Sequence, residues 1–497
     1  MKAVLAIDQG TTGTTCLVLD QHCTVLGRGY SEFTQHYPRP GWVEHDAAEI
    51  WDVTRRVAEE AVAAARGRGN VELAGVGITN QRETVVIWDR ETGEPVHRAI
   101  VWQDRRTAAR CRELKEQGRE SWARERTGLV LDPYFSGTKL EWLLGNVDGL
   151  QARAERGELA AGTMDSWLVW KLTGGAVHVT DPTNASRTLL YNIRSLAWDD
   201  ELLDLFGVPR ALLPEVQHSA AVYGHTTETS LGMSVPVAGM AGDQQAALFG
   251  QGCVSAGTAK NTYGTGAFLL LHTGTEPVPS KSGLLTTVAC GPQGEPAYAL
   301  EGSIFIAGAA VQWLRDGLRI IESAGETDRL ARSLTTNDGV YFVPAFVGLG
   351  APHWESEARG TIVGLTRGSS REHMVRAALE SMAYATHDVL RAMEEDSGII
   401  ATELAVDGGA SLNDWLMQFQ ADIVGLDVRR PAMVETTALG AAGLAGIATG
   451  VWRDAAQFME EREPPTTFAP GMDDASRDEL LDGWKRAVGA ALQWAGR

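Results

Sequence analysis

The chain begins with two short apolar runs separated by a turn made almost entirely of glycine and threonine. The runs are residues 4–7 and 16–19, and residues 10–15 between them contain two glycines and four threonines. Such small residues allow backbone N–H groups and hydroxyls to converge on an anion. Asp8 ends the first run, where a carboxylate can hold Mg2+ beside phosphate groups. The pattern predicts a phosphate-binding hairpin, and an ordinary hairpin turn is the alternative while this segment is considered alone.

Two further glycine turns occur later in the chain. Residues 264–266 read Gly-Thr-Gly and lead into the apolar residues 267–271, which repeats the hairpin pattern. Residues 404–409 end in Asp-Gly-Gly, and a helix-like segment follows at residues 415–424. This third turn places glycine backbone at a helix N-terminus, where phosphate groups bind readily. Three such turns predict two related halves that close on one nucleotide.

The composition excludes several classes of function. With 44 Lys and Arg against 64 Asp and Glu, the formal charge is -20, which repels nucleic acid and anionic membranes. The five cysteines are scattered without a C-x-x-C pair, so reduced thiols of a cytoplasmic protein are expected. Every long apolar stretch is interrupted before the ~20 residues that a bilayer requires, and the first residues lack a secretory-signal pattern. Neither a nucleic-acid partner nor membrane insertion is therefore expected.

Alternating strand and helix patterns predict an α/β fold of two large domains. Asp46 and Glu49 have the spacing of a capping box for a helix that ends near residue 66. The glycines at residues 250–257 mark the expected domain boundary, which divides the chain into residues 1–252 and 253–497. Other expected elements are strands at 73–79 and 84–88, helices at 105–117 and 139–144, hairpins over 253–300, and helices at 304–323, 371–396 and 437–448.

Asp243 is a candidate general base. It lies where a predicted strand gives way to a predicted helix, beside Gln244 and Gln245. A helix N-terminus favours the ionised carboxylate, so a weakly basic group is expected at neutral pH. Phosphoryl transfer tolerates a weak base, because the loose transition state mainly requires that the attacking hydroxyl be oriented. A simple N-cap is the alternative interpretation.

A polar turn and two aromatic residues can form a pocket for a small polyol. Residues 80–83 read Asn-Gln-Arg-Glu between two apolar strands, and they can donate and accept hydrogen bonds. Trp102 and Tyr134 can provide an aromatic wall against a short carbon chain. An exposed turn and ordinary core aromatics are the alternatives for each feature alone.

Taken together, the ordered motifs resemble the FGGY family of carbohydrate kinases, and within it the members that phosphorylate glycerol. The resemblance runs from about Ala3 to the last few dozen residues, and many ordered motifs are more specific than one glycine turn. The segments that carry it are residues 8–12 (DQGTT), 41–46 (GWVEHD), 77–84 (GITNQRET), 102–103 (WQ), 132–139 (DPYFSGTK), 242–251 (GDQQAALFGQ), 308–313 (GAAVQW), 360–365 (GTIVGL) and 407–410 (DGGA).

The resemblance implies two actin-like, ribonuclease-H-like domains with a cleft for ATP and substrate between them. It implies ATP-dependent phosphorylation of glycerol to sn-glycerol 3-phosphate, assembly as a homodimer or homotetramer, Asp243 as the general base and Asp8 as the residue that organises Mg2+. The implied glycerol site comprises Arg82, Glu83, Trp102, Tyr134, Asp243, Gln244 and Phe268. The implied nucleotide site comprises Thr11, Thr12, Gly13, Thr15, Thr265, Gly308, Gln312, Gly409 and Asn413.

The chain departs from the family at three places. Thr15 stands where relatives commonly carry a phosphate-contacting arginine, so weaker ATP binding is expected. The loop at residues 228–234 has no cation for a bisphosphate effector. The segment at residues 471–476 lacks the glutamate that some relatives use to bind a partner protein through zinc. Regulation by those two routes is not expected.

Two other functions remain open from the sequence. Another FGGY kinase, acting on a longer polyol or a ketose, would share the nucleotide motifs, and only the set of Arg82, Glu83, Trp102 and Tyr134 argues for glycerol. A non-catalytic nucleotide switch of the actin type would share the fold, and Asp243 beside a polyol pocket argues against it.

Overall fold

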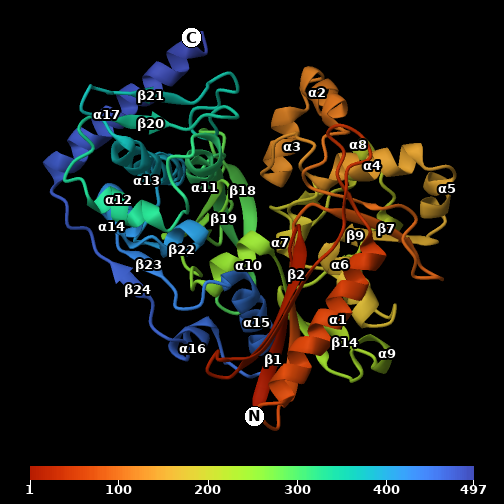
Figure 1. Cartoon of the computed structure of the whole chain (residues 1–497). Helices are drawn as coiled ribbons and strands as arrows, with labels where there is room; N and C mark the ends of the chain where they lie inside the picture. The colour runs from red at the N-terminus through yellow and green to blue at the C-terminus, as the bar shows by residue number, and fades with distance from the viewer. Residues whose placement is uncertain (497) are drawn as a thin grey trace.

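A computed structural model describes residues 1–496 of the chain. Two lobes lie side by side, the first built mostly from the N-terminal half and the second from the C-terminal half (Figure 1). Each lobe is built around a large mixed sheet, and helices cover both. No helix among residues 1–496 is long and apolar enough to cross a bilayer. The expected α/β class is confirmed.

The first sheet has six strands in the order β14, β15, β6, β1, β2, β3. β1 is antiparallel to β2 and parallel to β6, and β6 is parallel to β15. The alternating residues of β1 and β2 pack into different clusters on the two faces of the sheet, which is the expected pattern for strands buried on both sides. The bounds are β1 Lys2–Gln9, β2 Gly13–Asp20, β3 Val25–Glu32, β6 Glu72–Asn80, β14 Ala220–His225 and β15 Pro236–Gly242.

The second sheet repeats this plan in seven strands ordered β18, β19, β17, β16, β22, β23, β24. β16 is antiparallel to β17 and parallel to β22, as β1 is to β2 and β6. The two predicted glycine hairpins are therefore the corresponding first hairpins of two related sheets. The bounds are β16 Thr258–Tyr263, β17 Ala267–Gly274, β18 Leu285–Cys290, β19 Pro296–Ile304, β22 Glu403–Gly408, β23 Val428–Arg430 and β24 Thr466–Phe468.

Smaller sheets and helices complete the lobes. A five-stranded sheet contains β4 Gln35–His36, β5 Glu44–His45, β8 Ala99–Ile100, β7 Val85–Asp89 and β9 Leu159–Thr163, and two-stranded pairs are β10 Val179–Thr180 with β13 Glu215–Val216, β11 Tyr191–Asn192 with β12 Ala197–Trp198, and β20 Tyr341–Val343 with β21 Thr361–Val363. The helices are α1 Ala47–Arg66, α2 Ala108–Glu116, α3 Glu120–Thr127, α4 Ser136–Asn146, α5 Leu150–Glu155, α6 Met164–Leu172, α7 Pro182–Ala185, α8 Asp200–Phe206, α9 Glu228–Leu231, α10 Asp243–Gly250, α11 Gly308–Gln312, α12 Glu326–Arg332, α13 Arg371–Ser397, α14 Asp414–Val424, α15 Thr436–Ala448, α16 Ala455–Glu460 and α17 Asp474–Trp494.

Two local predictions need correction, and a third is confirmed. The capping box at α1 is half right, because Asp46 accepts from the N–H of Glu49 but the Glu49 carboxylate bonds to Thr34 instead. The predicted helix at residues 304–323 is only α11 and one wider turn to Gly317, because β19 occupies the chain up to residue 304. The strand predicted at residues 84–88 is confirmed as β7, which lies in the five-stranded sheet.

Helix α15 crosses back from the second half to cover the first sheet. It lies beside β1 near the centre of the molecule (Figure 1), and its alanines pack with Val4, Ala6 and Ala241. This close approach is possible because the sheet presents glycine to α15, and a Cβ at Gly77 of β6 would lie 2.1 Å from the Ala441 carbonyl oxygen of α15. The helix therefore ties the C-terminal half to the sheet that carries the first glycine turn.

We expect the change Gly77→Ala to lower the free energy of unfolding by about 1–3 kcal/mol, because the added methyl group must push α15 away from the sheet. Urea unfolding measures this loss. Gly145→Ala in α4 is the matched control, since a Cβ there meets no atom within 4 Å. If the Gly77 and Gly145 variants were equally stable, the tight packing of α15 on β6 would be contradicted.

Candidate functional site

The neighbouring strands β6 and β15 end at the same edge of the first sheet. They are parallel, and Asn80 at the end of β6 pairs with Gly242 at the end of β15. Arg82 follows one strand and Asp243 follows the other, so their side chains meet, with Arg82 Nε 3.1 Å from Asp243 Oδ1. The backbone of Glu83 has φ of 61°, a left-handed conformation that is uncommon outside glycine and that occurs at functional sites.

A row of residues across the second sheet faces the same place. Lys260 of β16, Leu270 of β17 and Glu301 of β19 are register partners, so their side chains share one face of the sheet. Leu270 packs with Leu248 of α10, which shows that this face is turned toward the helix that begins with Asp243. The charged residues Lys260 and Glu301 of the second sheet therefore face the strand ends of the first sheet, on the side where α10 lies.

Five side chains from both lobes form what we call the ionic cluster: Arg82, Glu83, Arg187, Asp243 and Glu301. Arg82 Nη1 lies 2.6 Å from Glu301 Oε2, and Arg187 Nη2 lies 3.0 Å from Glu301 Oε1. Arg187 Nε donates to Glu83 Oε1 at 2.7 Å. The side chain of Asp243 is 35% exposed, whereas those of Arg82 and Glu301 are 2% and 1% exposed. Asp243 is therefore more exposed to solvent than Arg82 or Glu301.

The charges of the cluster set its protonation states. Burial alone would raise the pKa of Glu301, but Arg187, Arg82 and Lys260 lower that pKa to about 2. Burial raises the pKa of Asp243, and Arg82 and the N–H of Gln244 oppose that rise. The helix N-terminus was expected to keep Asp243 a weak base. Because burial outweighs the local hydrogen bond, the carboxylate is more basic than that argument predicted.

Gln244 is held by the second lobe. Its Oε1 accepts a hydrogen bond from Lys260 Nζ, which also donates to Thr262 Oγ1 at 2.8 Å. Lys260 is fully buried, and burial lowers its pKa to about 8 against the opposing charges of Asp407 and Asp243. Since the side-chain oxygen of Gln244 is occupied, its amide N–H groups are the free part of the side chain.

The two predicted aromatic residues do form a wall. The rings of Trp102 and Tyr134 meet edge to face, with centroids 5.5 Å apart at 90°. Arg187 lies 5.8 Å from the Tyr134 ring, which places the wall beside the ionic cluster. Trp102 Nε1 donates to Thr11 Oγ1 at 3.0 Å, so the wall also touches the first glycine turn. Lys139, which is buried, donates to the carbonyl oxygens of residues 134 and 135 and fixes this loop.

The first glycine turn is compact and partly open. Gly10 N donates to the Gly13 carbonyl at 2.9 Å, and a Cβ at Gly13 would lie 2.7 Å from the Ser31 carbonyl oxygen. Thr12 is exposed, whereas Thr11 and Thr15 are half-buried. Asp8 pairs with Thr15 across the hairpin. Burial, together with repulsion from Asp243 and Glu435, raises the pKa of Asp8 to about 7.

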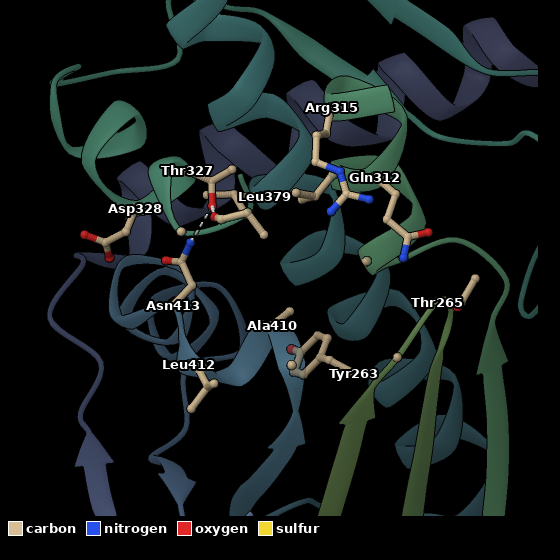
Figure 2. Close-up of a pocket in the computed structure, with 16 residues that line it drawn as sticks. Tyr263, Thr265, Gln312, Arg315, Thr327, Asp328, Leu379, Ala410, Leu412 and Asn413 are labelled. Atoms are coloured by element: carbon tan, nitrogen blue, oxygen red, sulfur yellow. Dashed lines mark hydrogen bonds between the residues drawn. The ribbon is translucent and has the colours of Figure 1, made fainter. Parts of the chain in front are cut away.

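A cavity of about 600 Å³ lies in the second lobe (Figure 2). Its lining includes all five nucleotide residues predicted for this half: Thr265, Gly308, Gln312, Gly409 and Asn413. Asn413 also caps α14, since its Oδ1 accepts from Leu416 N and its Nδ2 donates to Thr327 Oγ1 at 3.0 Å. Arg315 extends into the same cavity from above (Figure 2), and no sequence motif singled it out. Residues 8–15 do not line this cavity.

Phe268 lies on the face of β17 that turns toward α10. It is half-buried, and it shares this face with Leu270 because the two are separated by one residue in the strand. Its register partners are Thr262 of β16 and Ser303 of β19, so it lies one row beyond Lys260 and Glu301.

Sequence reasoning missed three charged residues of this site. Glu301 lies within an otherwise ordinary apolar strand, Arg187 follows the short helix α7, and Lys260 opens the second glycine hairpin. A charged residue inside a mostly apolar strand is the signal that could have found Glu301, because such residues are rarely buried unless they are paired. Lys260 lies in the mostly polar strand β16 and gives no such signal. Nothing local distinguishes Arg187 from a surface arginine.

Comparison with known proteins assigns both halves of the chain to one family. Residues 3–250 match the N-terminal domain of the FGGY family of carbohydrate kinases, and residues 259–449 match its C-terminal domain. The chain is 58% identical over 497 residues to a glycerol kinase of Carboxydothermus hydrogenoformans, with 99% of each chain covered. It is 56% identical over 497 residues to glycerol kinase 2 of Thermotoga maritima, with 100% of each covered.

Solved structures agree with this assignment. A glycerol kinase of Plasmodium falciparum, crystallised with ADP, superposes with a TM-score of 0.94 at 36% identity, covering 99% of this chain and 98% of that one. A xylulose kinase of Lactobacillus acidophilus superposes with a TM-score of 0.88 at 21% identity, covering 100% and 99%. The second match extends to the fold alone.

Proposed function

The chain belongs to the FGGY family of carbohydrate kinases, and we propose that it transfers the γ-phosphoryl group of ATP to glycerol, forming sn-glycerol 3-phosphate. Full-length relatives that are 56% to 58% identical are glycerol kinases. The observation that carries the proposal is the ionic cluster beside the wall of Trp102 and Tyr134, with one half-exposed carboxylate at the opening. Such a site combines hydrogen-bonding groups for hydroxyls with an apolar surface for a short carbon chain.

In this proposal Asp243 accepts the proton of the attacking hydroxyl. Its side chain is partly exposed, and the partial burial holds its pKa above the ordinary aspartate value, which suits a general base. Arg82 and Glu83 orient the hydroxyls, and Trp102 and Tyr134 contact the carbon chain. Gln244 and Phe268 complete the glycerol site, Gln244 through the amide N–H groups that Lys260 leaves free.

The nucleotide spans both lobes in this proposal. The adenosine part lies in the cavity of the second lobe, and the phosphates reach the first glycine turn. Glycine backbone and hydroxyls at both turns supply the N–H and O–H donors that phosphates require. The residues proposed to contact ATP are Thr11, Thr12, Gly13, Thr15, Thr265, Gly308, Gln312, Gly409 and Asn413.

Asp8 is the residue proposed to hold Mg2+. Its carboxylate lies at the end of β1 beside the turn. Burial, together with repulsion from Asp243 and Glu435, raises its pKa to about 7, and a bound cation would offset both effects. Mg2+ is commonly bound through one or two carboxylates and substrate phosphates, so one aspartate fits. Mg2+ bound there would neutralise charge on the ATP phosphates.

We also propose that the chain divides functionally near residues 250–257, that its two lobes close on the substrates, and that it works in the cytoplasm as a homodimer or homotetramer. Closure would keep water from the transferred phosphoryl group. Light scattering of the purified protein measures the assembly state, and a monomer would contradict that part of the proposal.

The activity test is ATP-dependent phosphorylation of glycerol beside dihydroxyacetone, erythritol, ribitol and xylulose, with Mg2+ present. Selective turnover of glycerol is expected. Turnover of xylulose or ribitol alone would keep the family and contradict the glycerol assignment. Absence of turnover with every substrate would instead favour a nucleotide switch of the actin type.

We expect Thr15→Arg to lower the KM for ATP, because Thr15 shares a sheet face with Asp8 beside the phosphate turn and has no charge of its own. A charged hydrogen bond to phosphate contributes roughly 1.5–3 kcal/mol. Steady-state kinetics at saturating glycerol measures the change. Thr24→Arg is the control, because Thr24 is exposed and lies in the turn between β2 and β3, at the other end of β2. An unchanged KM for ATP in Thr15→Arg would show that no phosphate contact is missing.

A further inference from the structure

Glu301 occupies the centre of the ionic cluster. Its Oε2 accepts from Arg82 Nη1 at 2.6 Å, and its Oε1 accepts from Arg82 Nη2 at 3.2 Å and from Arg187 Nη2 at 3.0 Å. One carboxylate thus receives three N–H groups from two guanidinium groups. The side chain of Glu301 is 1% exposed, so its carboxylate is shielded from solvent.

Each arginine that contacts Glu301 also contacts a second carboxylate. Arg82 Nε lies 3.1 Å from Asp243 Oδ1 in an ion pair, and Arg187 Nε donates a hydrogen bond to Glu83 Oε1 at 2.7 Å. The guanidinium group is planar and rigid, so the hydrogen bonds to Glu301 fix the direction in which each arginine presents its Nε to the second carboxylate. The position of Glu301 therefore sets the positions of both outer carboxylates, the proposed base and a proposed glycerol contact.

The ionic cluster joins residues of both lobes. Glu301 belongs to β19 of the second sheet, whereas Arg82 and Asp243 follow β6 and β15 of the first. Buried ion pairs stabilise a fold only weakly in comparison with apolar packing. One donor of Arg187, Nη1, is also buried without a hydrogen-bond partner among residues 1–496. A cluster that leaves a donor unsatisfied is not what optimised packing would select, although removing one member is costly, and this points to a role in orienting groups.

We propose that Glu301 is a positioning residue of the polyol site, which orients Asp243 through Arg82 and Glu83 through Arg187. This inference rests on the proposed phosphorylation of glycerol. Because Glu301 is the second lobe's contribution to the cluster, the glycerol site of the first lobe has its full geometry only when β19 lies against it. The cavity proposed for adenosine belongs to the same second lobe. Placing this lobe against the first therefore completes the glycerol site and brings the nucleotide cavity beside it.

The test is Glu301→Gln, which keeps the shape of the side chain and removes its charge. We expect kcat/KM for glycerol to fall about 100-fold, because small displacements of positioned groups have effects of that size. The KM for glycerol should rise while the KM for ATP stays unchanged. Glu380→Gln is the matched control, since Glu380 is equally buried and paired with Arg376, but lies in α13 outside the site.

The split between the kinetic constants separates positioning from a purely structural role. Loss of folded protein lowers kcat and leaves both KM values unchanged. An unchanged KM for glycerol in Glu301→Gln would therefore overturn the inference. The proposed function would still stand if the wild type phosphorylates glycerol. A wild type without glycerol turnover would instead overturn the proposed function.

A second variant tests the same inference if Glu301→Gln does not fold. Arg187→Lys keeps the positive charge but cannot bridge Glu83 and Glu301 with a fork, so the same rise in KM for glycerol is expected. If both variants unfold under conditions where Glu380→Gln stays folded, the cluster is structural and the inference is wrong.

Discussion

Replacing Asp243 with Asn should lower kcat for glycerol by about 10²–10⁴-fold, the usual contribution of a general base. The amide has nearly the same shape as the carboxylate but cannot accept the proton of the attacking hydroxyl. The hydrogen bond from Gln244 N at 2.7 Å can persist to the amide oxygen, so the fold should be retained. Steady-state kinetics, together with a thermal unfolding curve, measures both properties.

The pH dependence of the wild type gives the same role an independent check. Asp243 accepts a proton only when it is ionised, so activity is present above its pKa and is lost as the pH falls through it. Burial raises this pKa, and the acid limb of kcat/KM should therefore lie above the titration of an ordinary aspartate. Asp396→Asn, which changes a carboxylate held by Ser280 and Ser282, is the matched control. Full activity of Asp243→Asn would rule out the assigned role.

Replacing Arg82 with Met should affect stability and activity together. The guanidinium group contacts Glu301, Gln245 and Asp243, and its loss leaves a buried carboxylate with one arginine fewer. Breaking a buried ion pair from one side costs about 3–5 kcal/mol in free energy of unfolding. Loss of the contact to Asp243 should also abolish most of the turnover. Urea unfolding and steady-state kinetics measure the two effects.

Two comparisons test the reason for the Arg82 effect. Arg82→Lys keeps the charge without the fork, so it should recover part of the stability but little of the turnover. Arg55→Met removes an exposed helix pair with Glu59 and should change the stability by less than about 1 kcal/mol. If Arg82→Met were as mild as Arg55→Met, the ionic cluster would have no energetic importance.

Much of the site was predictable because its residues lie where strands end. The Asp-Gln-Gly-Thr-Thr turn, the polar turn at residues 80–83 and Asp243 all follow strand-like runs, and the carboxyl ends of parallel strands gather at one edge of a sheet. The five residues that the family resemblance implied for the second nucleotide site also line one cavity. These positions depend on local patterns that a sequence displays directly.

Other parts were not predictable because they depend on contacts between distant segments. The Gly and Ala content of residues 437–448 predicts a helix that permits close packing, yet it does not say which sheet the helix will cover. In the structure Gly440 of α15 packs against the Ala246 backbone of α10. The same helix packs against Gly77 of β6. The pairing of Glu301 with Arg82 and Arg187 likewise joins residues more than one hundred positions apart.

The sequence by itself determined the α/β class, the two repeated glycine hairpins and the residue types at the strand ends, because turn geometry and strand patterns follow from short stretches of chain. Only the tertiary structure decided that α15 returns to the first sheet and that Glu301 of the second sheet joins the arginines behind Asp243. It also decided that Asp243 is more basic than a helix N-terminus alone would make it. Burial and charge pairing are properties of the assembled lobes, since they arise only when residues far apart in the chain exclude water from one another.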